Sequence, residues 1–351
     1  MKSLRIAVSG LNASDNPGPG VPVLRSLKES KDEIHLIGLA YDVLEPGNFM
    51  EDLIESSYVI PYPRSGPELL LERIKYIHSK ERLDMIFPTL DSELDNYISI
   101  QNELKQLGIR TFLPGKEQLH MRDKSVLKEN LEEAGIALPK TLVLQDAAGI
   151  HQAMTELTFP ILVKGIFYEA YLARTIEEAI GFFYHLAAKW GIPVILQECI
   201  IGEECNVAAI AKKGKTIGSV CMKKMFLTDK GKAWAGVSIR NEEVLQVSEN
   251  ILKYIQWDGG CELEYIIEEK TGKVFLLEIN PRFPAWIYLA TAAGQNLPLM
   301  QVKLAMGEEL RKQEEYRVGT VFVRHSRDEI IPLSSLDSLS TKAEISYRSK
   351  E

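Results

Sequence analysis

Short apolar segments alternate with helix-like segments over the first third of the chain, and this alternation restricts the fold more than any other feature. Three apolar runs have the length and composition of buried strands: residues 5–9, 34–39 and 85–87. Leu70, Ile74 and Ile77 recur at helical spacing between the last two runs. Strands separated by single helices predict a parallel sheet with helices on both faces. We further expect Asp91 to cap a helix that runs to about residue 107, and a strand at 110–113.

The pattern changes after Pro114-Gly115, which marks a domain boundary. A capping box at Thr175–Glu178 opens a helix in the next segment, and strands dominate from Pro193 onward. We therefore predict an α/β domain followed by an α+β region with a mostly antiparallel sheet. The expected divisions are residues 1–114, 115–190 and 191–351, with the last division closing in a hairpin between about 316 and 351.

Charge and composition narrow the range of partners. A net charge of −8 and a pI near 5.5 argue against a protein that binds nucleic acid or a membrane surface, because both need a basic face. No apolar run approaches the roughly 18 residues of a membrane span. The cysteines form no CxxC pair, so reduced structural thiols are favoured over a zinc site: Cys199, Cys205, Cys221 and Cys261. We expect a soluble, cytoplasmic protein.

Two glutamates on a predicted hairpin carry the clearest chemical signal. Glu264 and Glu278 are nearly equidistant from the turn at Thr271, so they should face each other across the two strands. Asn280 and Arg282 follow Glu278 with the same parity and should share its face. Two carboxylates and an amide oxygen suit Mg²⁺, and a guanidinium beside them suits phosphate or carboxylate. The alternative is a pair of solvated glutamates on an exposed sheet face.

The run from Leu276 to Arg282, LLEINPR, resembles the metal-binding signature of the ATP-grasp superfamily. It is most similar to the branch that contains carbamoyl-phosphate synthetase large chains and biotin carboxylase, and the resemblance extends over nearly the whole chain. It implies a Rossmann-like domain followed by a single ATP-grasp fold of two α+β subdomains. It also implies that Glu264, Glu278 and Asn280 hold two Mg²⁺ ions, which Mn²⁺ can replace, and that Arg282 steadies the phosphoryl group or the substrate.

The same resemblance assigns the ATP site. Lys124, in the pair Asp123-Lys124, and Lys164, at the end of a strand, would contact the phosphates. Glu204 would bind the ribose hydroxyls. A hinge strand would present backbone groups to adenine: Gln197, Glu198, Cys199 and Ile200.

The chain departs from the family pattern after Lys164. Relatives carry a glycine-rich loop there, whereas residues 165–171 are short and contain one glycine, so their backbone cannot wrap a phosphate as freely. Lys224 and Lys232 are the candidate catalytic replacements, in a cluster that also contains Lys223 and Lys230. A solvated charged loop is the alternative interpretation of that cluster.

Three further segments bear on the substrate. Residues 88–94 match a family pattern at a strand's C-terminal end, where open α/β sheets bind ligands. We expect the loop at 12–20 to help shape the acceptor pocket, although a plain turn explains it equally well. The aromatic segment 282–288 either narrows the pocket or packs in the core.

These features predict an ATP-dependent ligase that joins a carboxylate to an amine, or to a thiol, through an acyl phosphate. The carboxylate would belong to a small molecule or a peptide, and the resemblance also implies a homodimer as one oligomeric state open to the chain. A nucleotide-binding module with little turnover is the second interpretation, motivated by the short loop. A subunit similar to carbamoyl-phosphate synthetase is the third. Complete P-loop and GxGxxG motifs are absent from the sequence.

Overall fold

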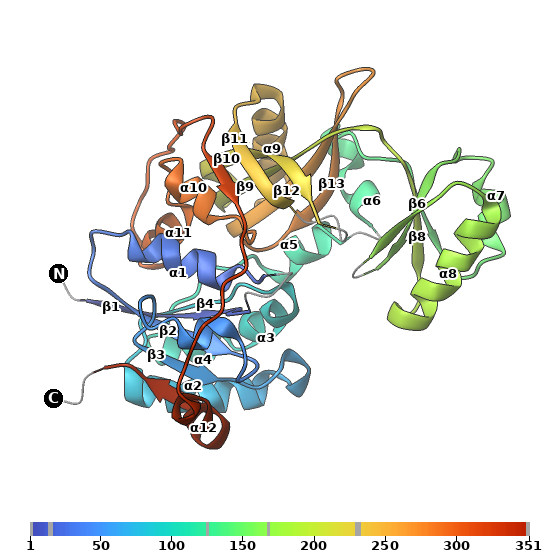
Figure 1. The fold of residues 1–351 in the computed structure, drawn as a ribbon. Helices are drawn as coiled ribbons and strands as arrows, with labels where there is room; N and C mark the ends of the chain where they lie inside the picture. Colours follow the sequence, from blue (N-terminus) through green and yellow to red (C-terminus); the bar gives the residue numbers. More distant parts are fainter. Residues whose placement is uncertain (1–2, 13–16, 124–125, 167–168, 229–232, 349–351) are drawn as a thin grey trace.

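The structure of the chain is a computed structural model that describes residues 3–12, 17–123, 126–166, 169–228 and 233–348. Its strands form sheets of five, four and six strands. We call these the first, second and third sheets, in the order in which the chain enters them. Figure 1 shows the first and third sheets in one body, with the second sheet projecting to the side.

The first sheet has the strand order β15-β3-β2-β1-β4. Four of its strands run parallel: β1 (Leu4–Ser9), β2 (Ile34–Ala40), β3 (Ser56–Val59) and β4 (Met85–Phe87). The predicted strands are therefore present, and β3 is an addition that the sequence did not predict. Two short 3₁₀ helices lie in its loops, η1 (Pro46–Phe49) and η2 (Pro63–Ser65).

Helices cover both faces of the first sheet, as predicted. Ile6 and Val8 of β1 share a core cluster with α1 (Gly20–Lys28), whereas Ala7, on the opposite face, lies in the cluster of the other helices. Those helices are α2 (Pro67–Glu81), α3 (Leu94–Ser99) and α4 (Gln101–Gln106). The side chains of Leu70, Ile74 and Ile77 are buried on α2, as their spacing indicated.

Two local predictions in this domain were wrong. Asp91 begins a 3₁₀ helix, η3 (Asp91–Glu93), instead of capping a single long helix, and the helical stretch is divided into α3 and α4. Its carboxylate contacts Arg282 of the third sheet. The expected strand at 110–113 is reduced to one bridge between Arg110 and Met85.

The second sheet has the order β5-β8-β6-β7, with β5 (Thr141–Leu144), β6 (Ile161–Gly165), β7 (Ala170–Ala173) and β8 (Val194–Glu198). It packs against α7 (Gly149–Ala153) and α8 (Ile176–Trp190). The predicted cap is present, since Thr175 Oγ1 accepts a hydrogen bond from Glu178 N at 3.3 Å. The connection from the first domain contains α5 (Lys116–Met121), α6 (Leu127–Leu131) and η4 (Glu132–Ala134).

The third sheet has the order β13-β12-β9-β10-β11-β14. Its strands are β9 (Gly202–Lys212), β10 (Lys215–Leu227), β11 (Ala233–Ile239), β12 (Gly259–Glu268), β13 (Val274–Asn280) and β14 (Val321–Val323). One face packs on α9 (Glu242–Tyr254) and α6. The other face packs on α10 (Tyr288–Ala292) and α11 (Leu297–Ala305), which share a core with α1 of the first domain. The first and third sheets are thus joined by a continuous apolar core.

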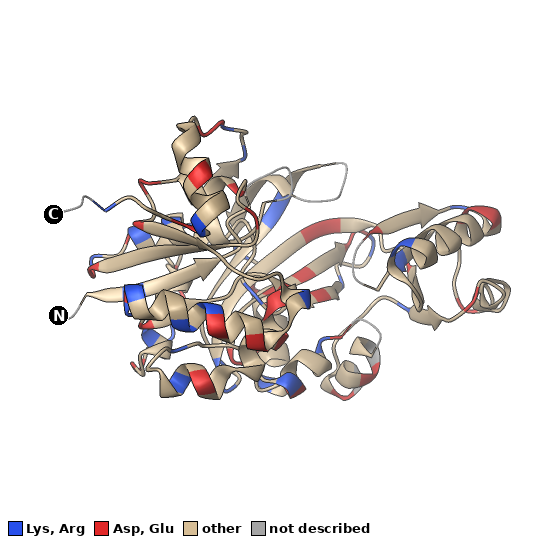
Figure 2. Cartoon of the chain, turned by 90° about the horizontal axis from the view of Figure 1, so that it is seen from below, with Lys and Arg blue, Asp and Glu red and all other residues tan. Residues whose placement is uncertain are grey.

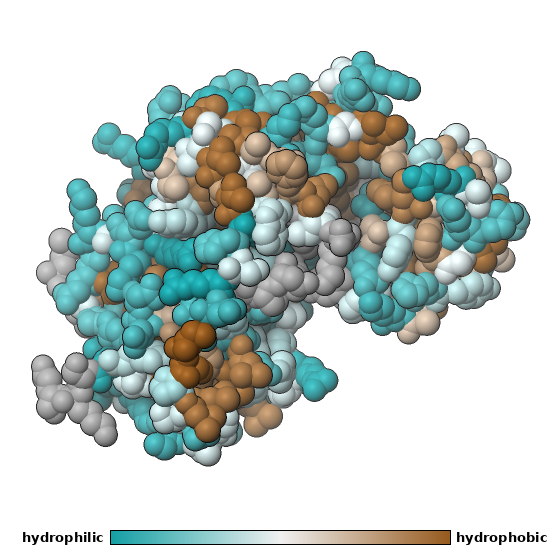
Figure 3. Space-filling model, viewed as in Figure 1, coloured by the Kyte–Doolittle hydropathy of each residue, from teal (hydrophilic) through white to brown (hydrophobic). Residues whose placement is uncertain are grey.

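The C-terminal segment does not form the predicted closing hairpin. β14 pairs with β11 in the third sheet, whereas β15 (Glu344–Ser346) pairs antiparallel with β3 in the first sheet. Residues 324–332 connect the two sheets and lead into α12 (Leu333–Lys342), as Figure 1 shows. Figure 3 shows apolar surface near this helix, where Ile330 and Leu333 are exposed.

Positions of basic and acidic residues alternate along the helices of the first domain, as the colours of the ribbon in Figure 2 show. Among the residues described, no helix combines the length and apolar character needed to cross a lipid bilayer.

Candidate active site

The central feature of the site is a row of polar side chains across three neighbouring strands of the third sheet. Glu264 on β12 lies opposite Glu278 on β13 and opposite Asn206 on β9. The next pair on the same face is Glu262 and Asn280. The predicted juxtaposition of Glu264 and Glu278 is therefore confirmed, and the period of two along each strand explains why Asn280 joins them.

Glu262 is a site residue that the sequence analysis missed. Its side chain is buried, and Oε1 accepts hydrogen bonds from Asn206 Nδ2 and Trp286 Nε1, each at 2.7 Å. Oε2 is 3.2 Å from Asn280 Nδ2 and 3.4 Å from Arg282 Nη1. Burial raises the pKa of Glu262, the negative charge of Glu264 adds to this rise, and Arg282 opposes it. The sequence does carry a signal for Glu262, because it stands two residues before Glu264 and therefore lies on the same face of the strand.

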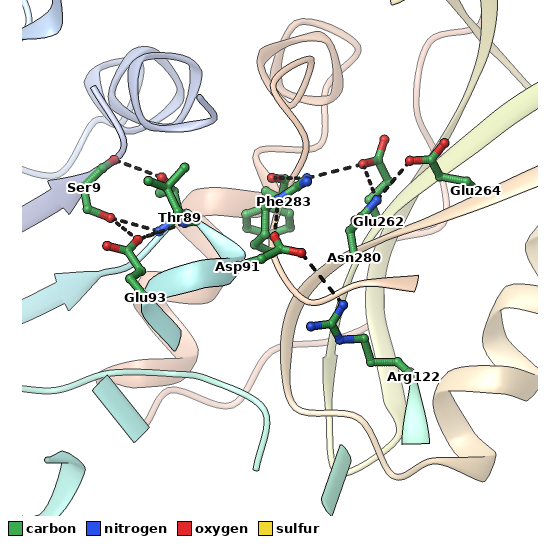
Figure 4. Close-up of polar contacts among 11 residues, drawn as sticks. Ser9, Thr89, Asp91, Glu93, Arg122, Glu262, Glu264, Asn280 and Phe283 are labelled. Carbon is green, nitrogen blue, oxygen red and sulfur yellow. Dashed lines mark hydrogen bonds and ion pairs between the residues drawn. The ribbon is translucent and has the colours of Figure 1, made fainter. Parts of the chain in front are cut away.

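Asn280 is oriented by these carboxylates. Its Nδ2 atom donates to Glu262 Oε2 at 3.2 Å and to Glu264 Oε1 at 3.0 Å, as Figure 4 shows. Because the amide nitrogen is committed to them, Oδ1 is the atom of this side chain left to bind a cation. Glu264, Glu278 and Asn280 thus offer the hard oxygen ligands that Mg²⁺ prefers. Within the described ranges, no group of three or more His, Cys, Asp or Glu side chains is arranged to hold a metal ion.

Lys224 projects from β10 onto the same face. Its Nζ atom is 2.6 Å from Glu204 Oε2 and 3.4 Å from Glu264 Oε2, and only 10% of the side chain is exposed. Burial lowers the pKa of Lys224, but the carboxylates of Glu264 and Glu204 outweigh burial and raise it overall. The ammonium group therefore remains charged beside the carboxylate row.

Lys223, the preceding residue, belongs to the opposite face of β10. Its Nζ atom is 2.6 Å from Glu203 Oε1 at the surface. The lysine cluster expected from the sequence is therefore divided by the alternation of the strand. Lys230 and Lys232 lie outside the described residues, as does Lys124.

Arg282 links the hairpin to the first domain. Its Nε atom is 2.8 Å from Asp91 Oδ1. Asp91 Oδ2 is 3.8 Å from Arg122 Nη1, a contact that Figure 4 shows. Burial lowers the pKa of Arg282, but the carboxylates of Asp91 and Glu262 more than offset this, so the guanidinium stays charged. The segment at 88–94 thus meets the hairpin directly.

The aromatic segment after Arg282 contributes both to the core and to the site. Phe283 and Trp286 are buried in the cluster that joins the two domains. The indole nitrogen of Trp286 donates to Glu262, so this ring also fixes the buried carboxylate.

The residues expected at the nucleotide lie around the connection between the second and third sheets. Lys164 Nζ donates to Gln197 Oε1 at 2.6 Å, and Gln197 Nε2 donates to Thr141 Oγ1 at 3.0 Å. Cys199 and Ile200 lie between β8 and β9. Burial raises the pKa of Cys199, and the nearby charge of Lys164 opposes that rise. Glu198 Oε2 instead accepts a hydrogen bond from Lys140 N at 3.1 Å, so its side chain binds the backbone of the residue that precedes β5.

Arg324, which follows β14, is partly buried and was not among the residues predicted from the sequence. Its guanidinium lies 5.8 Å from the centre of the Phe322 ring. Burial lowers the pKa of Arg324, whereas the negative charge of Glu262 opposes this effect. Nothing in the sequence around Arg324 distinguished it from an ordinary surface residue.

Residues 192–326 match a family model described as ATP-grasp in the biosynthetic pathway with Ter operon. The matched stretch runs from β8 to β14 and contains Lys224 and the whole Glu264–Arg282 constellation. This chain contains an ATP-grasp domain.

The sequence similarity to known proteins extends beyond residues 192–326. The carbamoyl phosphate synthase large chain of Micrococcus luteus is 22% identical over 315 residues, covering 82% of this chain and 27% of the relative. The N-terminal section of that large chain from Aquifex aeolicus is 20% identical over 317 residues, covering 83% of this chain and 54% of the relative. The chain therefore spans between about a quarter and about a half of these curated relatives.

Solved structures show the same ATP-grasp fold. The biotin carboxylase domain of Hydrogenobacter thermophilus 2-oxoglutarate carboxylase, crystallised as a dimer with MgADP and bicarbonate, superposes with a TM-score of 0.70 at 18% identity, covering 92% of this chain and 74% of that chain. The L-amino acid ligase of Bacillus licheniformis superposes with a TM-score of 0.64 at 13% identity, covering 87% and 75%. The resemblance and the fold predicted from the sequence are both confirmed.

Proposed function

We propose that this chain is an ATP- and Mg²⁺-dependent ligase that activates a carboxylate as an acyl phosphate and couples it to an amine. The observation that carries the proposal is the paired carboxylates of Glu264 and Glu278, with Asn280 beside them and Lys224 and Arg282 at the edges. Two like charges at opposed strand positions repel each other unless cations lie close by. A magnesium–triphosphate complex together with basic side chains meets that requirement.

The proposed reaction has two steps. A carboxylate oxygen of the substrate attacks the γ-phosphorus of ATP, the bond to the β-γ bridging oxygen breaks, and ADP leaves. The amine then attacks the acyl carbon, phosphate leaves, and the amine proton passes to solvent. A thiol is the alternative nucleophile for the second step.

In the first step, the chain's own residues would stabilise the negative charge of the reacting groups. Lys224 and Arg282 are held in place by carboxylates and remain protonated, so they would stabilise the negative charge of the transferring phosphoryl group. Glu264, Glu278 and Asn280 would hold magnesium, which supplies electrostatic stabilisation of the phosphates when bound.

The nucleotide would lie between the second and third sheets. Lys164 would contact its phosphates, with Lys124 beside them. The backbone of residues 197–200 would meet adenine, and Glu204 would accept hydrogen bonds from the ribose. The MgADP complex of the Hydrogenobacter thermophilus domain supports a nucleotide in this fold. The L-amino acid ligase supports a small carboxylate and an amine as substrates, and the crystallised dimer supports self-association.

A nucleotide-binding module with little turnover is the second candidate. The sequence after Lys164 favours it, because residues 165–171 contain a single glycine and their backbone cannot wrap a phosphate as freely. A subunit role similar to that of carbamoyl phosphate synthase comes third, since this chain matches about a quarter of that large chain from Micrococcus luteus.

Thermal unfolding with and without Mg-ATP tests the proposal, using the wild type and Glu278→Gln. Glu269→Gln, an exposed change at the end of the same hairpin, is the matched control. A ligand at about 100 times its dissociation constant adds roughly 2.7 kcal/mol of stability. We expect this gain in the wild type and the control, and a smaller gain in Glu278→Gln. ADP release is then measured with a panel of carboxylates and amines.

The outcomes separate the candidates. Stabilisation by Mg-ATP with carboxylate-stimulated ADP release supports the ligase. Stabilisation without release under any condition supports the binding module. No stabilisation of the wild type contradicts both.

A further inference from the structure

We propose that Asp91 of the first domain is a positioning residue for the reaction, which orients Arg282 toward the transferring phosphoryl group. This inference rests on the proposed ligase function. It assigns a role in the chemistry to a residue that lies outside the ATP-grasp hairpin, at the start of the 3₁₀ helix η3 that follows β4 of the first sheet.

The contacts of Arg282 define the orientation. Nε is 2.8 Å from Asp91 Oδ1, while Nη1 is 3.4 Å from Glu262 Oε2 and donates to the Phe283 carbonyl at 3.3 Å. Nη2 makes no hydrogen bond with any residue in the described part of the chain. Two nitrogens of the planar guanidinium are therefore fixed by protein, and the third is left for an oxyanion.

The two carboxylates differ in their distance from the arginine. Asp91 makes the shorter contact, at 2.8 Å against 3.4 Å for Glu262. Glu262 also serves Asn206, Trp286 and Asn280, so it is shared among four partners. Asp91 is thus the stronger determinant of the plane in which the guanidinium lies.

The turn that carries Asp91 is itself fixed by a buried acid. Glu93 is fully buried, and its Oε1 accepts hydrogen bonds from the backbone amides of Thr89 at 2.7 Å and Leu90 at 2.8 Å. Ser9 donates to the same oxygen, and Thr89 Oγ1 donates to the Ser9 carbonyl at 2.9 Å (Figure 4). The backbone that leads into Asp91 is therefore held by hydrogen bonds within the first domain, and this fixes the direction in which the Asp91 side chain points.

A second guanidinium keeps Asp91 from turning away. Arg122, at the end of α5, places Nη1 3.8 Å from Asp91 Oδ2, on the oxygen that Arg282 does not use. The carboxylate thus bridges the hairpin and the connection between the domains. Side chains whose neighbours leave them one orientation make effective positioning groups, because small displacements at a reaction centre cost large factors in rate.

An ion pair that merely held the domains together would affect stability and not turnover. The variants Asp91→Asn and Asp95→Asn distinguish these roles. The first change keeps the shape of the side chain and removes its charge, while the second is a matched change on the exposed side of the adjoining α3. Both proteins are compared with the wild type in unliganded melting temperature, in Mg-ATP affinity by calorimetry, and in ADP release.

ADP release is measured first with Mg-ATP and water alone, and then with the carboxylate panel. We expect Asp91→Asn to lower kcat by about tenfold or more, with the Mg-ATP dissociation constant changed by less than about twofold. Asp95→Asn should match the wild type in all three measurements.

Each outcome decides a separate point. Wild-type kcat in Asp91→Asn overturns the positioning role and leaves the ligase proposal intact. A fall in melting temperature and nucleotide affinity together with kcat assigns Asp91 a structural role and also overturns the inference. If the wild type binds Mg-ATP but releases no ADP under either condition, the ligase proposal fails, and the role of Asp91 fails with it.

Discussion

Glu264 and Glu278 lie directly opposite each other on adjacent strands of the third sheet. Such a pair is unfavourable by itself, because opposed strand positions bring Cβ atoms to about 5 Å and like charges there repel. The positive charges of Lys224 on one side and Arg282 on the other offset this repulsion. The arrangement therefore has the electrostatics of a cation site.

Glu278→Gln should abolish most turnover. The substitution preserves the side chain's shape but removes one anionic ligand, and we expect ADP release to fall on the order of 100-fold. The requirement for magnesium should rise at the same time. A magnesium titration of ADP release measures both effects, with Glu269→Gln as the control. Wild-type release at low magnesium in Glu278→Gln would remove the metal assignment.

Lys224→Met should lower kcat by about 100-fold, because an ammonium held on the carboxylate face is lost. Lys223→Met is the matched control, since it removes the neighbouring lysine from the opposite face of the same strand. The raised pKa of Lys224 also predicts that its protonation does not limit activity below the usual lysine value of about 10.4. Equal losses in the two variants would contradict a specific role for Lys224. The measurement is steady-state ADP release across pH.

The buried acid Glu93 predicts a pH-dependent difference in stability. Burial raises its pKa, so its contribution to folding is fully present below the ordinary glutamate value of about 4.3 and is lost as pH rises through the raised value. Glu93→Gln keeps the neutral form at every pH, and its amide can still serve Thr89, Leu90 and Tyr41. Relative to the wild type, this variant should therefore gain stability as pH rises from 4.5 to 8.

Melting temperatures of both proteins at several pH values check this expectation. The difference between them removes the contribution of Glu262, whose raised pKa does not depend on Glu93. The pKa of Glu45 is raised by burial and also by the charge of Glu93, so it changes in the same direction as the effect of the substitution. A difference that stays constant with pH would contradict the assignment. Glu93→Ala should be worse at every pH, since each buried backbone amide left without a partner costs about 1–3 kcal/mol.

Glu262→Ala should destabilise the protein by about 2–4 kcal/mol, because Asn206 and Trp286 lose their buried acceptor. Glu262→Gln should be milder, since the raised pKa indicates that the site tolerates a neutral side chain. Thermal unfolding of both variants provides the comparison, with Glu269→Ala as an exposed control. Equal losses in Glu262→Ala and Glu262→Gln would indicate that the charge, and not the hydrogen bonds, matters.

Arg348→Ala should weaken the attachment of the C-terminal segment. Arg348 Nη2 is 2.7 Å from the buried Glu81, whose remaining partners include Tyr58 and Ser56, so we expect a modest loss of about 1 kcal/mol at neutral pH. Burial alone would raise the pKa of Glu81, but its hydrogen bonds lower it overall. The loss should therefore shrink as pH falls below the usual glutamate range. Melting temperatures at pH 7 and pH 4 test both statements.

The hairpin was predictable because its signals are local. Thr271-Gly272 marks the turn, and the period of two along a strand then fixes which side chains share a face. The division of Lys223 from Lys224 follows from the same rule, which the expectation of one cluster did not take into account. The expectation for Lys230 and Lys232 stays a prediction, because both lie outside the described residues.

Long-range relationships were not predictable in this way. The match at 88–94 indicated a ligand-binding strand end, but the contact of Asp91 with the hairpin was not predictable, because it depends on how separate sheets pack. β15 is three residues long and has no distinctive composition, so nothing in it indicates a partner in the first sheet. The site therefore divides into a part encoded within one hairpin and a part created by tertiary assembly.

The pairing of β15 with β3 has a consequence for how the protein acquires its structure during synthesis. The edge of β3 stays unpaired until residues 344–346 have left the ribosome, after the whole ATP-grasp region has been made. Until then the growing chain exposes backbone groups that can pair with other strands, which is a hazard for association between unfinished chains. Closing a loop of this length also slows the step that completes the sheet. In nascent chains that have not yet released residues 344–346, the edge of β3 should therefore be a point of association with other strands.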